Sequence, residues 1–204
     1  MKDLSKIPDY QIVATAACNG DLETLEYFKS KDYKFNYGDL RYALHNNHIH
    51  VIKFFIDFMK NNPEEKSSFM LSEFWHDATI SNNIDQVKYL IDEGFPVDST
   101  AYTYPIENCN KQMLDLLYKN KFPLTTNEFN SAIEKSDWSI LYWLKDHNCP
   151  WDETTCVWAI KNRKLATLMW LHYNGCPWDN DVLIFSKSWG NHEICQWLEF
   201  NYKN

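Results

Sequence analysis

The chain has 204 residues, of which 45% are hydrophobic and 16% aromatic, and this composition excludes a disordered polypeptide. Its formal net charge of −8 argues against a protein that binds a nucleic-acid backbone, because such binding needs a basic face. No apolar run is long enough to span a bilayer, and residues 1–8 contain no apolar core of a secretory signal. The sequence therefore predicts an intracellular, cytoplasmic protein with neither nucleic-acid nor membrane partners.

Two series of residues recur along the chain at a fixed spacing of 27, with one step of 35. The first is a series of small residues: Ala16, Ala43, Ala78, Pro105, Ala132, Ala159 and Ser186. The second is a series of large apolar residues: Phe28, Phe55, Leu90, Leu117, Leu144, Leu171 and Leu198. A fixed period between 20 and 50 residues is the signature of a repeat architecture.

The two series divide the chain into seven repeats, and the step of 35 is a repeat with eight extra residues. We expect a single array over residues 8–202. Its predicted repeats are 8–34, 35–69 (with the insertion), 70–96, 97–123, 124–150, 151–177 and 178–202.

Each repeat reads as helix, turn, helix. In 124–150, Thr126 is a possible N-cap of the first helix, Asp137 can cap the second, and Pro150 ends the unit. The cap of the second helix recurs along the chain as Asp21, Asn83, Asn110, Asp137 and Asn191.

Two repeats are irregular. Residues 61–68 are polar and contain a proline, so we expect the insertion to form a surface loop after a long helix. Pro105 replaces the alanine of the fourth repeat and predicts a first helix that begins near the proline or is kinked there. We therefore expect distorted stacking between the third and fifth repeats.

A third series precedes the large apolar one by one position and is mostly aromatic. It consists of Tyr27, Phe54, Tyr89, Leu116, Trp143, Trp170 and Trp197. We interpret it as core between repeats rather than as a ligand box, because apolar stripes at helical spacing usually pack inside. Each residue that follows a repeat-ending proline is expected to close the loop onto the stack: Val97, Leu124, Trp151 and Trp178.

The second helices carry a family resemblance. Residues 19–28, 82–94 and 190–198 resemble the second helix of the ankyrin repeat, with its Gly-His-x-Glu-Val-Val-x-x-Leu-Leu-x-x-Gly pattern. The Cys-Pro-Trp-Asp links at 149–152 and 176–179 are similar to those in ankyrin-repeat proteins of large DNA viruses of amoebae. The resemblance implies an all-α solenoid of about seven stacked helix-turn-helix repeats. Ankyrin units have about 33 residues, so the shorter repeat implies tight loops instead of projecting β-hairpins.

No pattern of an enzyme or of a cofactor site is present. The five glycines do not cluster into a phosphate-binding loop. The six cysteines are expected to be reduced thiols, and Cys149 and Cys176 lie one repeat apart, too far for a disulfide. His147 with Cys149 and His172 with Cys176 each offer two zinc ligands, but stacking separates the pairs. We therefore expect no catalytic, cofactor-binding or metal-binding residues and no small-molecule substrate.

The expected function is a protein-interaction module, a scaffold or adaptor that binds a host or viral protein, since repeat arrays present extended concave surfaces. The alternative is a structural component of a virion or assembly. By the ankyrin resemblance, a partner contacts first-helix positions two and three residues after the small residue. The predicted partner-binding residues are His45, Asn46, Ile80, Ser81, Glu107, Asn108, Glu134, Lys135, Lys161 and Asn162. The insertion at 61–68 is the alternative contact.

Overall fold

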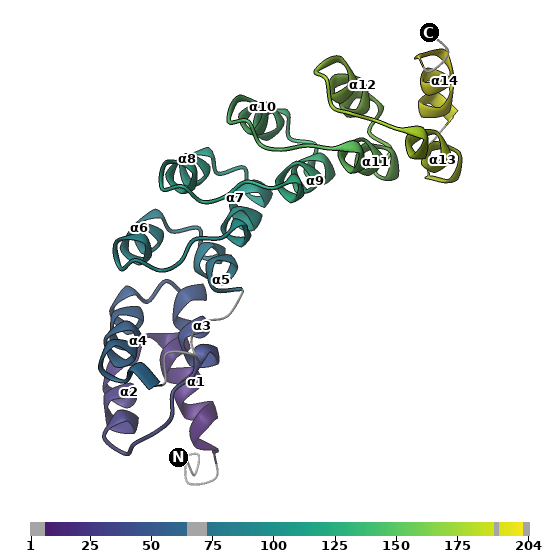
Figure 1. The fold of residues 1–204 in the computed structure, drawn as a ribbon. Coiled ribbons are helices and arrows are strands. Elements are labelled where there is room, and N and C mark those ends of the chain that lie inside the picture. The colour runs from purple at the N-terminus through teal and green to yellow at the C-terminus, as the bar shows by residue number, and fades with distance from the viewer. Residues whose placement is uncertain (1–6, 65–72, 190–191, 202–204) are drawn as a thin grey trace. The chain divides into compact units, whose positions relative to one another are not determined.

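The computed structural model describes residues 7–64, 73–189 and 192–201, and within these ranges the chain is helical with no β-strand (Figure 1). None of the helices in these ranges is long and apolar enough to cross a bilayer. The chain divides into two compact units, which we call the N-terminal unit (residues 1–104) and the C-terminal unit (residues 105–204). The all-helical class predicted from the sequence is confirmed.

The N-terminal unit is built from three helix pairs and a short 3-10 helix. They are α1 (Asp9–Asn19) with α2 (Leu22–Lys29), α3 (Tyr37–His45) with α4 (Ile49–Asn61), α5 (Phe74–Ile80) with α6 (Ile84–Asp92), and η3 (Ser99–Tyr102). The first helix of each pair packs on the next, so that α1, α3, α5 and η3 form one layer. The second helices form the other layer, in which α2 packs on α4.

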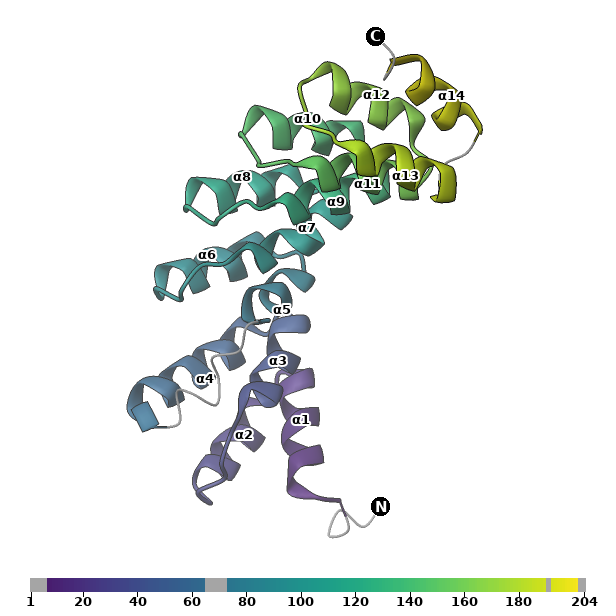
Figure 2. The same ribbon diagram turned by 45° about the vertical axis from the view of Figure 1, so that its right-hand side comes forward.

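The C-terminal unit repeats this plan. It contains α8 (Lys111–Lys119), α9 (Thr126–Lys135) with α10 (Trp138–Asp146), α11 (Glu153–Lys161) with α12 (Leu165–Tyr173), and α13 (Asn180–Trp189) with α14 (His192–Asn201). Here α11 packs between α9 and α13 in the layer of first helices (Figures 1 and 2). The short α7 (Thr103–Glu107) spans the boundary between the units.

Both residue series that define the period are buried. In the small series, side chains such as Ala43 and Ala159 are fully buried, which lets neighbouring first helices approach closely. In the large series, Phe55 and every leucine from Leu90 to Leu198 are fully buried, and Phe28 is 7% exposed. Full burial of side chains of this size contributes about 1.5–3 kcal/mol each. The series therefore form the core between the two layers.

In the first six repeats, the turn after the first helix contains one residue in the left-handed conformation, four positions after the small residue. These residues are Gly20, Asn47, Asn82, Cys109, Ser136 and Arg163. The next backbone N–H donates to the carbonyl of the small residue, as from Asp21 to Ala16 at 2.8 Å and from Lys164 to Ala159 at 2.9 Å. This is the bond of a Schellman turn, which satisfies a carbonyl at the helix end.

The turn after the second helix has the same left-handed residue in the first repeat and in the third to sixth repeats. Residues four positions after the large apolar residue have positive φ, among them Gly94, Lys121, Asn148 and Gly175. The N–H of Cys149 donates to the carbonyl of Leu144 at 2.9 Å. Among the described residues, bonds of this kind to both period-setting residues are present in the first, fourth and sixth repeats.

The predicted caps of the second helices are confirmed at Asp21, Asn83, Asn110 and Asp137, whose side chains accept from backbone N–H groups two or three residues later. Asn191 lies outside the described residues. The prediction for α9 was one residue off. Thr126 is the first residue of the helix, whereas Thr125 is the N-cap and forms a capping box with Glu128.

The third, mostly aromatic series is less buried than predicted. Phe54 and Trp143 are buried, but Tyr27 is 57% exposed and Trp170 is half-buried. Trp170 contacts the rings of Trp138 and Tyr142 in the neighbouring second helix, α10, and part of its side chain remains exposed. The prediction that this series is core is therefore wrong for Tyr27 and holds in part for Trp170.

The prediction of the residues that close the loops was also wrong by two positions. Val97 is 41% exposed, and Leu124, Trp151 and Trp178 are half-buried. The buried side chains are those that precede the prolines: Phe122, Cys149 and Cys176. The loops are held on the stack by these residues, because the left-handed turn points them inward.

The fourth repeat is distorted at its proline, as predicted. Its first helix is split into η3 and α7, and Pro105 occupies the third position of α7. The boundary between the two units falls directly before Pro105. In the second repeat, α4 runs to Asn61. Residues 65–68 of the predicted insertion loop lie outside the described residues.

Candidate functional site

The layer of first helices in the C-terminal unit carries a groove of about 530 Å³ across α9, α11 and α13. We call it the α11 groove. Its lining combines hydroxyl, amide, carboxylate and aromatic side chains. They are Thr126, Asn127, Asn130, Glu153, Thr154, Val157, Trp158, Lys161, Asp179, Asp181 and Phe185.

Two aromatic rings and an ammonium group meet in the lining of the α11 groove. The Trp158 side chain remains 37% exposed. The Nζ atom of Lys161 lies 5.8 Å from the centre of the Trp158 ring and 5.2 Å from the centre of the Phe185 ring. Both distances fit cation–π contacts. The groove therefore already holds a cation against its aromatic surface.

A hollow of about 430 Å³ lies on the first helices of the N-terminal unit, over α1 and the neighbouring Tyr42 of α3. We call it the α1 hollow. Four of its residues, Gln11, Ala14, Thr15 and Cys18, occupy the repeat positions that Thr154, Val157, Trp158 and Lys161 occupy in α11. These positions follow the spacing i, i+3, i+4 and i+7, which places them on one helix face. The same face thus lines a hollow in each unit.

A network of polar side chains lies on this face between α3 and α5. The Asp77 side chain is fully buried. It accepts hydrogen bonds from Tyr37 Oη at 2.6 Å and from His45 Nε2 at 2.7 Å, and it forms an ion pair with Arg41 Nε at 3.0 Å. Burial acts to raise the pKa of Asp77, but these three groups together lower it below its ordinary value. The network ties two repeats together and orients Arg41 and His45.

The predicted partner-binding residues fall into two classes. The residues two positions after the small residue are His45, Ile80, Glu107, Glu134 and Lys161, and these are exposed or half-buried. The residues three positions after it are Asn46, Ser81, Asn108, Lys135 and Asn162, and they stand at or just after the helix end. Asn46 and Asn162 donate their side-chain amides to backbone carbonyls four residues earlier. At these two positions the side chain caps its own helix.

Of the ten predicted residues, only Lys161 lines the α11 groove, and none lines the α1 hollow. The prediction missed the positions one and two residues before the small residue, among them Tyr42 and Trp158. Helical spacing from Lys161 leads back to these positions, so the sequence contained a signal for them.

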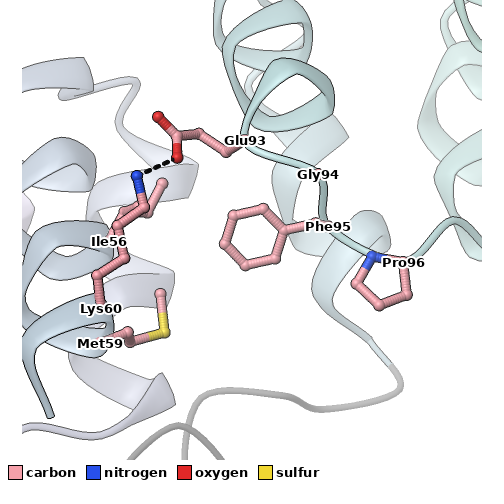
Figure 3. A pocket seen from close by; sticks show the side chains of 7 residues that line it. All are labelled: Ile56, Met59, Lys60, Glu93, Gly94, Phe95 and Pro96. Carbon is pink, nitrogen blue, oxygen red and sulfur yellow. Dashed lines mark ion pairs between the residues drawn. The ribbon is translucent and has the colours of Figure 1, made fainter. Parts of the chain in front are cut away.

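A second kind of hollow, about 330 Å³, lies between α4 and the loop after α6 in the N-terminal unit (Figure 3). Ile56, Met59 and the ring of Phe95 give it an apolar wall. At its rim Lys60 Nζ pairs with Glu93 at 2.6 Å, and this pair lowers the pKa of Glu93. Because the two charges neutralise each other, the hollow suits an apolar group rather than an ion.

The histidines and cysteines considered as zinc ligands have structural contacts. The ring of His147 stacks on Trp143 at 4.0 Å, and the ring of His172 stacks on Trp178 at 4.1 Å. The thiols of Cys149 and Cys176 donate to backbone carbonyls of Thr125 and Asp152. Within the described ranges, no group of three or more His, Cys, Asp or Glu side chains is placed to hold a metal ion.

No protein-family model matches this chain, and no curated protein matches it either. The ankyrin resemblance therefore rests on the repeat residues alone.

Proposed function

We propose that the chain is an ankyrin-type solenoid of short repeats that binds a protein partner through its first helices. The support for the architecture is the regular succession of helix pairs within each unit. Support also comes from the two buried series and from the left-handed turns that recur among the described residues. In such arrays each repeat contacts only its neighbours, which leaves one face of the first helices available.

One observation carries the binding function. The same four positions of the first helix line the α1 hollow in one unit and the α11 groove in the other. An open hollow on the first helices of each unit suits a protein surface better than a compact small molecule, which needs one enclosed cavity.

The side chains on this face also fit a protein partner. Tyr42 is 45% exposed and Trp158 is 37% exposed, and Arg41 lies beside Tyr42 with about half of its side chain exposed. Trp, Tyr and Arg are the residue types that most often dominate the energy of protein interfaces.

The test is a pull-down with the double variant Tyr42→Ala, Trp158→Ala. The matched control changes two exposed aromatic residues of the second helices, Tyr27→Ala and Tyr173→Ala. Circular dichroism establishes that both variants are folded. The proposal predicts that the first variant loses its partner and the control retains it. Loss in the control alone would place the interface on the second helices.

Under the same proposal, the protein acts in the cytoplasm as a scaffold or adaptor. A structural component of a virion or assembly would instead be found in stoichiometric amounts in purified particles. Quantitative mass spectrometry of such particles separates the two functions.

A further inference from the structure

The α11 groove has an excess of negative charge. Glu153, Asp179 and Asp181 contribute three carboxylates, and Lys161 is the one basic residue of the lining within the described part of the chain. Asp179 is engaged in its own turn, where it accepts the N–H of Asp181 at 2.9 Å. The side chains of Glu153 and Asp181 are exposed in the first turns of α11 and α13. The dipoles of α11 and α13 stabilise these two carboxylates, and both side chains line the groove.

An uncompensated acceptor lies in the same groove. The Oδ1 atom of Asn130 is buried and finds no hydrogen-bond donor among the described residues. A buried acceptor without a donor destabilises the protein when the groove is empty. A ligand that brings an N–H group to this atom removes that destabilisation.

The aromatic surface completes a site for a cation. Trp158 and Phe185 already contact the ammonium of Lys161. Exposed carboxylates, a free acceptor and aromatic faces all attract positively charged N–H donors, and they disfavour carboxylates and phosphates.

We infer that the α11 groove receives a lysine or arginine side chain from an extended, basic segment of the protein partner, and that Lys161 occupies its place when the groove is empty. The inference rests on the proposed function and names the partner's chemistry. It gives Lys161 a role opposite to that of an ordinary contact residue, because its charge competes with the ligand.

The experiment measures binding of three capped glycine–serine peptides by fluorescence anisotropy. One contains lysines, the second has glutamate in place of each lysine, and the third has glutamine. The full chain is compared with Glu153→Gln/Asp181→Asn, with Lys161→Met, and with the control Glu193→Gln. Glu193 is an exposed first-turn acid of α14, outside the groove.

We expect the lysine peptide alone to bind. Its affinity should fall about three- to tenfold in the double variant, because each exposed charge pair contributes about 0.2–1 kcal/mol. The affinity for the lysine peptide should rise about two- to fivefold in Lys161→Met, because the loss of one exposed charge changes binding by a similar free energy. Glu193→Gln should leave it unchanged, and added salt should weaken it.

Three results would overturn the inference: weaker binding of the lysine peptide to Lys161→Met, preference for the glutamate or glutamine peptide, or no binding of any peptide. A folded Tyr42/Trp158 variant that loses its protein partner would still support the proposed function in each case. The two proposals therefore fail separately.

Discussion

Asp77 is a carboxylate without solvent exposure that joins α5 to α3. Its partners differ in exposure. Tyr37 is buried, whereas the side chains of Arg41 and His45 are 47% and 26% exposed. Removal of the charge leaves the Tyr37 hydroxyl with a weaker partner inside the protein. Arg41 and His45 remain partly exposed to water, so the removal of the charge affects them less.

We expect Asp77→Asn to lower the free energy of unfolding by about 1–3 kcal/mol, the cost of poorly satisfied buried groups. Tyr37→Phe should cost less, since Arg41 and His45 still neutralise the carboxylate. Because folding lowers the pKa of Asp77, its contribution is present above the ordinary value of 3.8 and is lost as the pH falls through the lower, folded pKa. Urea denaturation at neutral and acidic pH measures both effects. Equal stability of Asp77→Asn and the wild type would show that the network adds nothing.

Asp39 has the opposite dependence on pH. Its side chain is 5% exposed and accepts the N–H of Asn36 at 3.0 Å. Burial raises the pKa of Asp39 from 3.8 to about 6, against the smaller effect of that hydrogen bond. The ionised form is thus disfavoured in the folded state. Stability from this residue is full below pH 3.8 and is lost as the pH rises through about 6.

We therefore expect Asp39 to reduce the stability of the wild type between about pH 4 and pH 6, and Asp39→Asn to show a smaller loss while its amide oxygen still caps α3. Some loss remains because burial also raises the pKa of Glu128. Urea midpoints measured across the range give the slopes of both proteins. Parallel slopes would rule out titration of Asp39 in this range. The window does not overlap with that of Asp77, so the two residues can be separated.

At the scale of the helices and turns, the backbone rather than the residue type sets the geometry. The left-handed position after the first helix is taken by glycine, asparagine, cysteine, serine and arginine in different repeats. At Gly20 a side chain is excluded, because a Cβ atom would approach His48 Nδ1 at 2.9 Å. At Arg163, φ is 56° and the side chain is exposed.

A non-glycine residue in this conformation costs about 1–2 kcal/mol. We expect Arg163→Gly to raise the free energy of unfolding by about 1 kcal/mol, because the folded conformation is less strained. Arg163→Ala should not, since alanine carries the same Cβ. Thermal denaturation of both variants gives the comparison. Stabilisation by alanine and glycine alike would point to the charge of Arg163 instead.

The period of the helices could be read from the sequence because burial selects the residue type at the small and large positions. Ala159 and Leu171 tolerate few alternatives in a closely packed layer. The turn residues carry no such signal, since the Schellman bond forms with several residue types. The aromatic series misled the prediction because a tryptophan such as Trp170 is apolar whether it lies in the core or at its edge.

This distinction gives a prediction for neighbouring residues of α12. Leu171 is fully buried and Trp170 is half-buried. We expect Leu171→Ala to cost about 2–5 kcal/mol and Trp170→Ala to cost less, although tryptophan is the larger side chain. Urea denaturation orders the two variants. A larger loss for Trp170→Ala would restore the aromatic series to the core and would give its contacts with Tyr142 and Trp151 a greater share of the stability.

At the scale of the whole molecule, the layer that carries the proposed site followed from the sequence, but the site itself did not. The first helices were predicted, and Lys161 was among the chosen residues. The groove around it depends on which side chains leave space between α9, α11 and α13. That depends on packing between repeats, which a single helical pattern does not reveal.

The division into two units leads to the last prediction. Each unit has its own buried core, with Leu44 in one and Leu144 in the other, both fully buried. In repeat proteins, stability is approximately a sum of terms within repeats and between neighbours. We therefore expect Leu44→Ala and Leu144→Ala each to cost about 2–5 kcal/mol and to act mainly on the unit that contains the substitution. Hydrogen exchange resolved by segment measures this. Protection should fall most at residues 9–61 for the first variant and at residues 126–173 for the second. Equal loss of protection in both units from either substitution would show that the 204 residues unfold as one cooperative body.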